Sequence, residues 1–141
     1  MQCTVHANTA VHGSGIFSSA GYGEPDIRKT IISFGSMGPG LECEPMSPYV
    51  PQLRCCDIFG NPGGDWIGLI ANQYGTSGNI SEDPLYCEPQ LMDVGLQEGS
   101  PCAPFSPPNP ECGRIGAWPV SCGSSPVSPT SWGRIKFLFL Q

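Results

Sequence analysis

Short apolar segments recur along the first sixty residues at a nearly constant spacing. The three most similar ones are "CTVHAN" at 3–8, "TIISFG" at 30–35 and "CCDIFGN" at 55–61. Each is a short apolar run that ends at a polar or glycine turn, which is a pattern typical of a β-strand. In register, 27 residues separate Val5 from Ile32, and 26 separate Ile32 from Ile58. A period of this length built from short strands is typical of a solenoid.

Two further elements keep the same spacing. They are "SGIFSS" at 14–19 with "PGLECE" at 39–44, and "EPDIRKTII" at 24–32 with "VPQLRCCDI" at 50–58. This alignment pairs Ile16 with Leu41, Ile27 with Leu53, and Arg28 with Arg54. Chance similarity among the strands of a β-sandwich is the alternative, but three elements that share one period favour a repeat.

The sequence therefore predicts an all-β fold, a right-handed parallel β-helix of about three rungs. Val5, Ile32 and Ile58 are expected to stack about 4.8 Å apart in one core. The bend positions Asn8 and Asn61 are expected to hydrogen-bond along the same column.

The second half of the chain departs from the repeat. Apolar residues at Ile67, Ile70, Ala71 and Tyr74 follow helical spacing, so we expect a short helix on an excursion loop at 65–75. Asp65 is the expected N-cap, and Gly75 marks the end of the helix.

These patterns divide the chain into three parts. Residues 1–98 form the rungs, and the Pro- and Cys-rich stretch 99–122 forms a disulfide-clipped cap. We expect this cap to cover the open end of the stack, because an uncovered rung is an exposed strand edge. Residues 123–141 are a linker followed by one more strand.

Composition changes the picture in three ways. About a quarter of the chain is glycine or proline, which fits many turns between short strands. The net charge of −6, with no basic cluster, argues against a nucleic-acid partner. The longest apolar run, "IKFLFL" at 135–140, is far shorter than the roughly 20 residues that span a bilayer.

Eight cysteines in an acidic, loop-rich chain favour disulfides and an oxidising compartment. The start "MQCTVHAN" lacks the features of a signal peptide. Because residue 3 already lies in a strand pattern, we expect the C-terminal piece of a longer secreted or cell-surface protein.

Several landmarks resemble one group of proteins. The series "CCDIFGNPGGDW", "GNISEDPLYC", "GSPCAPFSPPNPECGRIGAWPVSC" and "SWGRIKFLFLQ" is similar to the C-terminal region of secreted bacterial right-handed parallel β-helix repeat proteins. The wider β-helix class includes pectate lyases, polysaccharide hydrolases, tailspikes and adhesins. The resemblance thus implies an extracellular location and contact with carbohydrate. It does not imply a particular activity.

The spacing of the cysteines suggests two pairs. Cys102 and Cys112 would clip the proline-rich loop, and closing such a loop stabilises by roughly 2–3 kcal/mol. Cys55 and Cys56 are expected to point to opposite faces of a strand, with Cys56 in the core and Cys55 directed to Cys87 or Cys43. Metal ligation by thiolates is the weaker alternative, because no closely spaced cysteine pair of the zinc-site kind is present.

Charged and aromatic side chains supply the candidate binding residues. Arg28 and Arg54 would form a small basic column, with Asp57 able to pair with it. The chain shows no dedicated calcium loop, but Asp57 and Asp65 are weak calcium candidates. The carboxylates considered for acid–base chemistry are Asp57, Asp65, Glu82, Asp83, Glu88 and Asp93.

Aromatic faces suit sugar rings, although most aromatic residues serve cores. Tyr22 and Tyr49 occupy equivalent loops and are the expected exposed pair, with Trp66 a further candidate ligand. Together these features favour a non-catalytic extracellular module that contacts polysaccharide. The alternatives are the end of a carbohydrate-active β-helix enzyme, or a self-assembling protein that pairs through open rungs.

Overall fold

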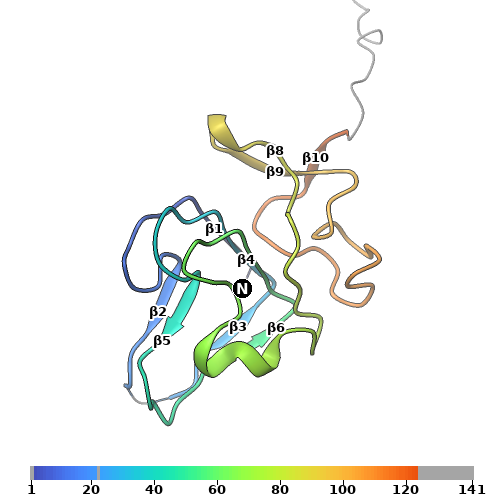
Figure 1. The fold of residues 1–141 in the computed structure, drawn as a ribbon. Helices are drawn as coiled ribbons and strands as arrows, with labels where there is room; N and C mark the ends of the chain where they lie inside the picture. The colour runs from blue at the N-terminus through green and yellow to red at the C-terminus, as the bar shows by residue number, and fades with distance from the viewer. Residues whose placement is uncertain (1, 22, 124–141) are drawn as a thin grey trace, which may run out of the picture.

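The structure is a computed structural model that describes residues 2–21 and 23–123, in which short strands wind into successive coils. Coil 1 contains β1 (Cys3–His6), β2 (Ile16–Ser18) and β3 (Asp26–Arg28); coil 2 contains β4 (Thr30–Ser33), β5 (Leu41–Cys43) and β6 (Gln52–Arg54); and β7 (Asp57–Phe59) opens coil 3. The remaining elements are η1 (Gly68–Gln73), β8 (Tyr86–Glu88), η2 (Pro89–Leu91), β9 (Asp93–Gln97) and β10 (Val120–Cys122). Figure 1 shows the paired strands of coils 1 and 2, with β8, β9 and β10 beside them. All but the first residue of the predicted linker and terminal strand, 123–141, lies outside the described residues, as does Tyr22.

Strands of successive coils run parallel in three columns, β1–β4–β7, β2–β5 and β3–β6. In the first column Val5 lies opposite Ile32, and Ile32 lies opposite Ile58. The other columns pair Ile16 with Leu41, Ile27 with Leu53, and Arg28 with Arg54. The predicted short parallel β-helix and its register are therefore confirmed.

The interior of the coils is a compact apolar core. Its fully buried members are Ile32, Leu41, Leu53, Cys56, Ile58 and Ile70. The predicted inward position of Cys56 is confirmed. The coil is narrow enough that a Cβ at Gly40 would lie 2.8 Å from Ile58 Cγ2 and 2.6 Å from Asn61 Nδ2, so glycine is required at this corner.

The helical segment is shorter than predicted. It is a 3₁₀-helix over Gly68–Gln73, and Ile70 is its buried residue, whereas Ile67 and Tyr74 are exposed. Asp65 does not cap it, because its carboxylate instead accepts hydrogen bonds from the backbone N–H groups of Gly60 and Asn61. The apolar spacing predicts a full helical face, but within the helix only Ile70 packs on the coil interior.

Two side-chain amides close the far end of the stack. Gln73 accepts a hydrogen bond from Leu53 N–H and donates to the Pro51 carbonyl. Asn79 accepts from Cys56 N–H and donates to the Leu53 carbonyl. These amides occupy the positions that the main chain of a further rung would otherwise fill, and so they end the β3–β6 column.

The predicted asparagine column is only partly present. Asn61 reaches toward coil 2, where its Oδ1 accepts from Gly35 N–H and its Nδ2 donates to the Ile32 carbonyl. Asn8 is exposed, and its main-chain carbonyl accepts from Ser36 N–H. The bends are therefore joined by amide-to-backbone bonds and not by a ladder of stacked amides.

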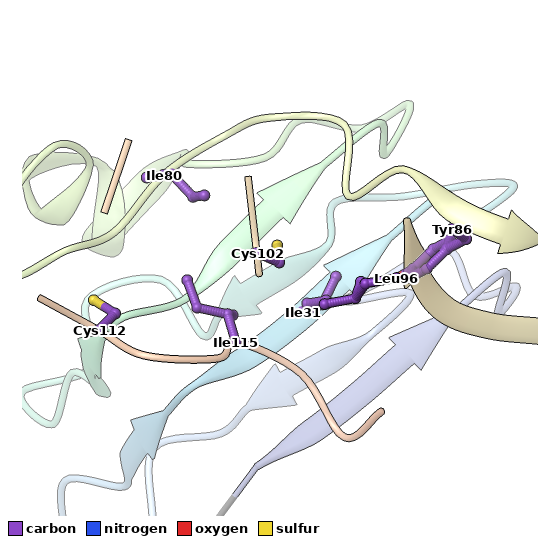
Figure 2. Packing of buried hydrophobic residues seen from close by; sticks show 7 residues of the cluster. All are labelled: Ile31, Ile80, Tyr86, Leu96, Cys102, Cys112 and Ile115. Atoms are coloured by element: carbon purple, nitrogen blue, oxygen red, sulfur yellow. The ribbon is translucent and has the colours of Figure 1, made fainter. Parts of the chain in front are cut away.

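Residues 81–122, here called the flank, pack against the outer face of the β1–β4–β7 sheet. Figure 2 shows the core that forms there, built from Ile31, Ile80, Tyr86, Leu96, Cys102, Cys112 and Ile115. Ile31 belongs to this outer core because it points out of the coil while its neighbour Ile32 points in, as strand alternation requires.

The expectation that 99–122 covers the end of the stack is wrong. Gln2 Nε2 donates to the Arg114 carbonyl, Gly116 N–H donates to the Lys29 carbonyl, and Cys112 is bonded to Cys55. These contacts reach coil 1, the corner before coil 2 and the corner before coil 3. The segment is thus a lateral wall. It buries the outward apolar face of β4, whereas the far end of the stack is already closed by side-chain amides.

Candidate functional site

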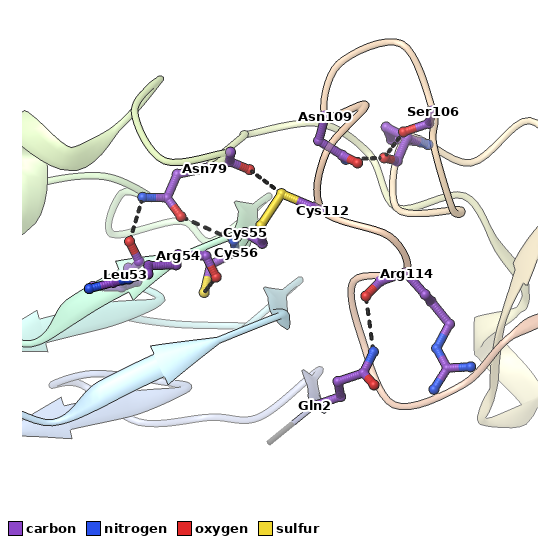
Figure 3. The surroundings of a disulfide bond; sticks show 12 residues. Gln2, Leu53, Arg54, Cys55, Cys56, Asn79, Ser106, Asn109, Cys112 and Arg114 are labelled. Carbon is purple, nitrogen blue, oxygen red and sulfur yellow. Dashed lines mark hydrogen bonds between the residues drawn. A yellow bond between two sulfur atoms is a disulfide. The ribbon is translucent and has the colours of Figure 1, made fainter.

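The disulfide between Cys55 and Cys112 is a cross-link between the coils and the flank (Figure 3). Cys55 lies at the corner between β6 and β7 with φ 54°, and Lys29 occupies the equivalent corner with φ 51°. This left-handed corner turns the Cys55 side chain out of the coil, while Cys56 turns in. Gly78 leaves room for the bridge, since a Cβ there would lie 2.2 Å from Cys112 Sγ.

Both predicted disulfide pairs are wrong. Cys112 bonds to Cys55 and not to Cys102, and Cys87 bonds to Cys122. Cys102 stays a thiol because it faces inward and donates to Asp57 Oδ2 at 3.1 Å. Sequence proximity suggested the Cys102–Cys112 clip, but the turns between them point the two side chains to different neighbours.

A cleft of about 730 Å³ opens beside the Cys55–Cys112 bridge. One wall comes from 74–82 and the other from 108–112. Its charged lining residues are Arg54, Glu82 and Glu111, which are all exposed. Ser77 and Ser81 add hydroxyl groups to the lining.

The aromatic face at the cleft is Tyr74. This residue is 55% exposed, and its ring lies 6.2 Å from the ring of Trp66. Trp66 is half-buried and donates from Nε1 to the Ile80 carbonyl, so it gives Tyr74 a fixed neighbouring ring. Tyr74 is therefore the ring that a ligand in the cleft would meet.

Asparagine side chains fix the two walls from within. Asn79 is buried with both ends of its amide bonded, as described above. Asn109 is also buried; its Nδ2 donates to the Pro101 carbonyl, while its Oδ1 has no partner among the described residues. The walls are thus held by internal bonds and by the disulfide, which leaves the exposed charged groups to face solvent.

The predicted ligand residues are dispersed over the molecule. Arg54 lines the cleft, but Trp66 and Tyr49 do not. Arg28 lies in register with Arg54 as predicted, yet its guanidinium bonds to Asp26 and not to Asp57. The adjacent Arg28 lowers the pKa of the Asp26 carboxyl through this hydrogen bond.

Asp57 is enclosed beneath the flank and does not form part of a surface site. Its Oδ1 accepts from Glu82 N–H and its Oδ2 from the Cys102 thiol. Burial raises the pKa of Asp57 to about 7, against the opposing effect of these donors. The predicted pairing of Asp57 with the arginines is wrong because the carboxyl faces the flank core.

The two calcium candidates serve separate structural roles. Asp65 binds the N–H groups of the 60–61 loop, and Asp57 binds donors of the flank. Within the described ranges, no cluster of three or more His, Cys, Asp or Glu side chains is placed to hold a metal ion.

Sequence reasoning missed the cleft although it singled out several of its residues. No repeat relates 74–82 to 108–112, so the sequence pattern does not predict that Glu82 and Tyr74 lie near Glu111. The signal lay in the cysteines, since only the Cys55–Cys112 pairing would have placed the two segments side by side.

Comparisons with protein families, curated proteins and solved structures found no match to this chain. No helix within 2–21 and 23–123 is both long enough and apolar enough to cross a membrane. The two disulfides indicate an oxidising environment.

Proposed function

We propose that this chain is a secreted, non-catalytic β-solenoid module that binds polysaccharide in the cleft beside Cys55–Cys112. The observation that carries the proposal is an exposed Tyr74 ring beside Arg54 in a cleft whose walls are fixed before any ligand arrives. A preformed concave site with one aromatic face and a few polar groups binds small rings with little ordering penalty.

The charges select among polysaccharides. The cleft carries two carboxylates against one guanidinium, and the chain as a whole has a net charge of −6. This field repels polyanions, so the ligand is a neutral or amino-sugar glycan and not a polyuronate. Calcium, which would bridge a polyuronate to carboxylates, has no role in this mode of binding.

A second candidate function is glycoside hydrolysis. Glu82 and Glu111 line the same cleft beside Arg54, and hydrolysis needs a pair of carboxyl groups across the scissile bond. These two carboxylates are the observation that supports an enzyme as the second candidate. This function would make the chain the end of a carbohydrate-active β-helix protein, which is one of the alternatives that the sequence leaves open.

A glycan array followed by a reducing-sugar assay on the oxidised protein tests both functions. We expect binding to neutral or amino-sugar glycans, at least tenfold weaker in Tyr74→Ala, with no release of reducing ends. Tyr49→Ala is the matched control, because Tyr49 does not line the cleft, and this variant should bind like the parent. Turnover abolished by Glu82→Gln or Glu111→Gln would establish the hydrolase, and absence of both binding and turnover would overturn the assignment.

A further inference from the structure

The two ends of the coil stack differ sharply. The far end is closed by the amides of Gln73 and Asn79, which bond to the main chain of coil 2 and the following corner. At the coil-1 end, β1, β2 and β3 are all outermost strands of their sheets. Among the described residues, no main-chain group hydrogen-bonds to the outer edge of these three strands.

The side chains of coil 1 show the same opening. Its inward residues Val5, Ile16 and Ile27 are only half-buried, whereas their register partners in coil 2 are 2% exposed or less. The flank touches this coil through the side chains of Gln2, Thr4 and His6, and none of these contacts uses the main-chain edge of β1. An apolar interior rimmed by unpaired main-chain groups is a template for strand pairing.

The main chain of β3 indicates what kind of strand can pair with the open edge of coil 1. Pro25 carbonyl accepts from Gln52 N–H, and Lys29 N–H donates to the Arg54 carbonyl, so these residues face coil 2. By the alternation of a strand, the main-chain groups of Asp26 and Arg28 face outward. The Arg28 carbonyl accepts one bond from Thr30 Oγ1 and keeps its second lone pair.

The sequence Asp26-Ile27-Arg28 is complementary to itself when read in the opposite direction. If β3 pairs antiparallel with β3 of a second copy and Ile27 lies on the two-fold axis, Asp26 of one copy stands opposite Arg28 of the other. Asp26 of one copy and Arg28 of the other then form a hydrogen-bonded pair of the antiparallel ladder, in which two main-chain hydrogen bonds join the opposite residues. Their half-exposed side chains would form a ring of alternating charge.

We propose that the coil-1 end is an isologous interface that joins two copies of this chain end to end. A two-fold axis through Ile27 pairs β3 with β3, and it pairs β1 of each copy with β2 of the other. Every strand of coil 1 then gains a neighbour, and the interior becomes continuous through both stacks. Because the interface is used up by one partner, assembly stops at two copies.

The test uses charge-reversed variants of the full chain, with native mass spectrometry and sedimentation equilibrium from about 1 μM to 1 mM. The parent should shift from one copy to two as its concentration rises. Asp26→Arg alone, or Arg28→Asp alone, should weaken self-association at least tenfold, because like charges then face each other. Glu98→Arg makes the same charge change as Asp26→Arg but lies outside coil 1, and it should dimerise like the parent.

The decisive step mixes the two single variants. The Asp26→Arg copy then presents two positive side chains on β3 to the two negative side chains on β3 of the Arg28→Asp copy. A one-to-one heterodimer should therefore form from two proteins that are monomeric alone. Circular dichroism of each variant checks that it is folded. A parent that is monomeric at every concentration, assemblies larger than two, or single variants that still dimerise would each overturn the proposal.

Discussion

The coil interior and the flank core are two apolar clusters of similar size that are built by different means. Interior residues such as Ile32 and Ile58 are neighbours because they lie one repeat apart, and parallel main-chain bonds hold them there. The flank core joins Ile31 to Tyr86, Leu96 and Ile115, which share no period. Both disulfides lie in or at the flank. Regular hydrogen bonding specifies the first cluster, whereas the second needs covalent links to fix loops that have few ladder bonds.

The two regions also treat polar groups differently. The interior buries main-chain groups and closes its end with neutral amides. The flank core buries the carboxyl of Asp57 against the thiol of Cys102. A neutral amide is satisfied by bonds at any pH, but a buried carboxyl ties the stability of the flank to its protonation state.

The largest expected effect is the loss of the Cys55–Cys112 bridge. The two residues are 57 apart in sequence, and in the chain-entropy model a loop of this length is worth about 4 kcal/mol. The double variant Cys55→Ser/Cys112→Ser should lose that much free energy of unfolding in a denaturant titration. Hydrogen exchange should accelerate in 99–117 before it does in β4.

The matched control for this variant replaces two free thiols, Cys3→Ser/Cys43→Ser, and should stay within about 1 kcal/mol of the parent. If the disulfide variant lost protection equally in β4 and the flank, the two regions would be one cooperative unit and the contrast between them would fail.

Next in size is truncation in the coil interior. Ile58 is fully buried, and Ile58→Ala should lower the free energy of unfolding by about 3 kcal/mol through lost burial and the cavity that remains. Ile67→Ala makes the same change at a residue that is 40% exposed, and it should cost less than about 1 kcal/mol. Equal losses at both positions would contradict the assignment of Ile58 to the core.

The end-closing amides are expected to contribute less. Asn79→Ala leaves Cys56 N–H and the Leu53 carbonyl without their partners, and it should cost about 2 kcal/mol. Asn8→Ala, at an exposed bend, is the control. If Asn79→Ala lost no more free energy of unfolding than Asn8→Ala, water would replace the Asn79 amide and this amide would not close the end of the stack.

The remaining effect comes from Asp57 and is spread over several pH units, so it is small for any one unit. Its pKa is raised from 3.8 to about 7, so the folded state binds a proton more tightly than the unfolded state does. Its stabilising contribution is complete below pH 3.8 and is lost as the pH rises to about 7, by at most ~1.4 kcal/mol per unit.

Asp57→Asn should remove this dependence in denaturation midpoints measured from pH 4 to 8. Asp83→Asn, at an exposed carboxyl, should retain it. A slope that is unchanged in Asp57→Asn would show that the buried carboxyl does not titrate with folding.

The sequence predicts the coils residue by residue because its repeat is visible in the strand pattern. Val5, Ile32 and Ile58 can be aligned without coordinates, and the same register places Cys56 inside. The short helix is recognisable from Ile70, but its length is overestimated because Ile67 and Tyr74 share the spacing without sharing the burial.

The candidate site is much less predictable. Arg54 is identified through its pairing with Arg28, but the opposite wall of the cleft is not. Eight cysteines allow many pairings, and proximity in sequence favours the wrong one for Cys112. Nothing local to Asp57 distinguishes a carboxyl in solvent from one beneath the flank.

The sequence by itself determined the coiled path, because each parallel strand must find its hydrogen-bonding partner one repeat away. The tertiary structure alone decided the partner of Cys55, the burial of Asp57 and the walls of the cleft. These features depend on how a non-repeating segment fits an outward apolar face. Many segments have a suitable composition, and only the packing of their side chains on that face decides which one covers it.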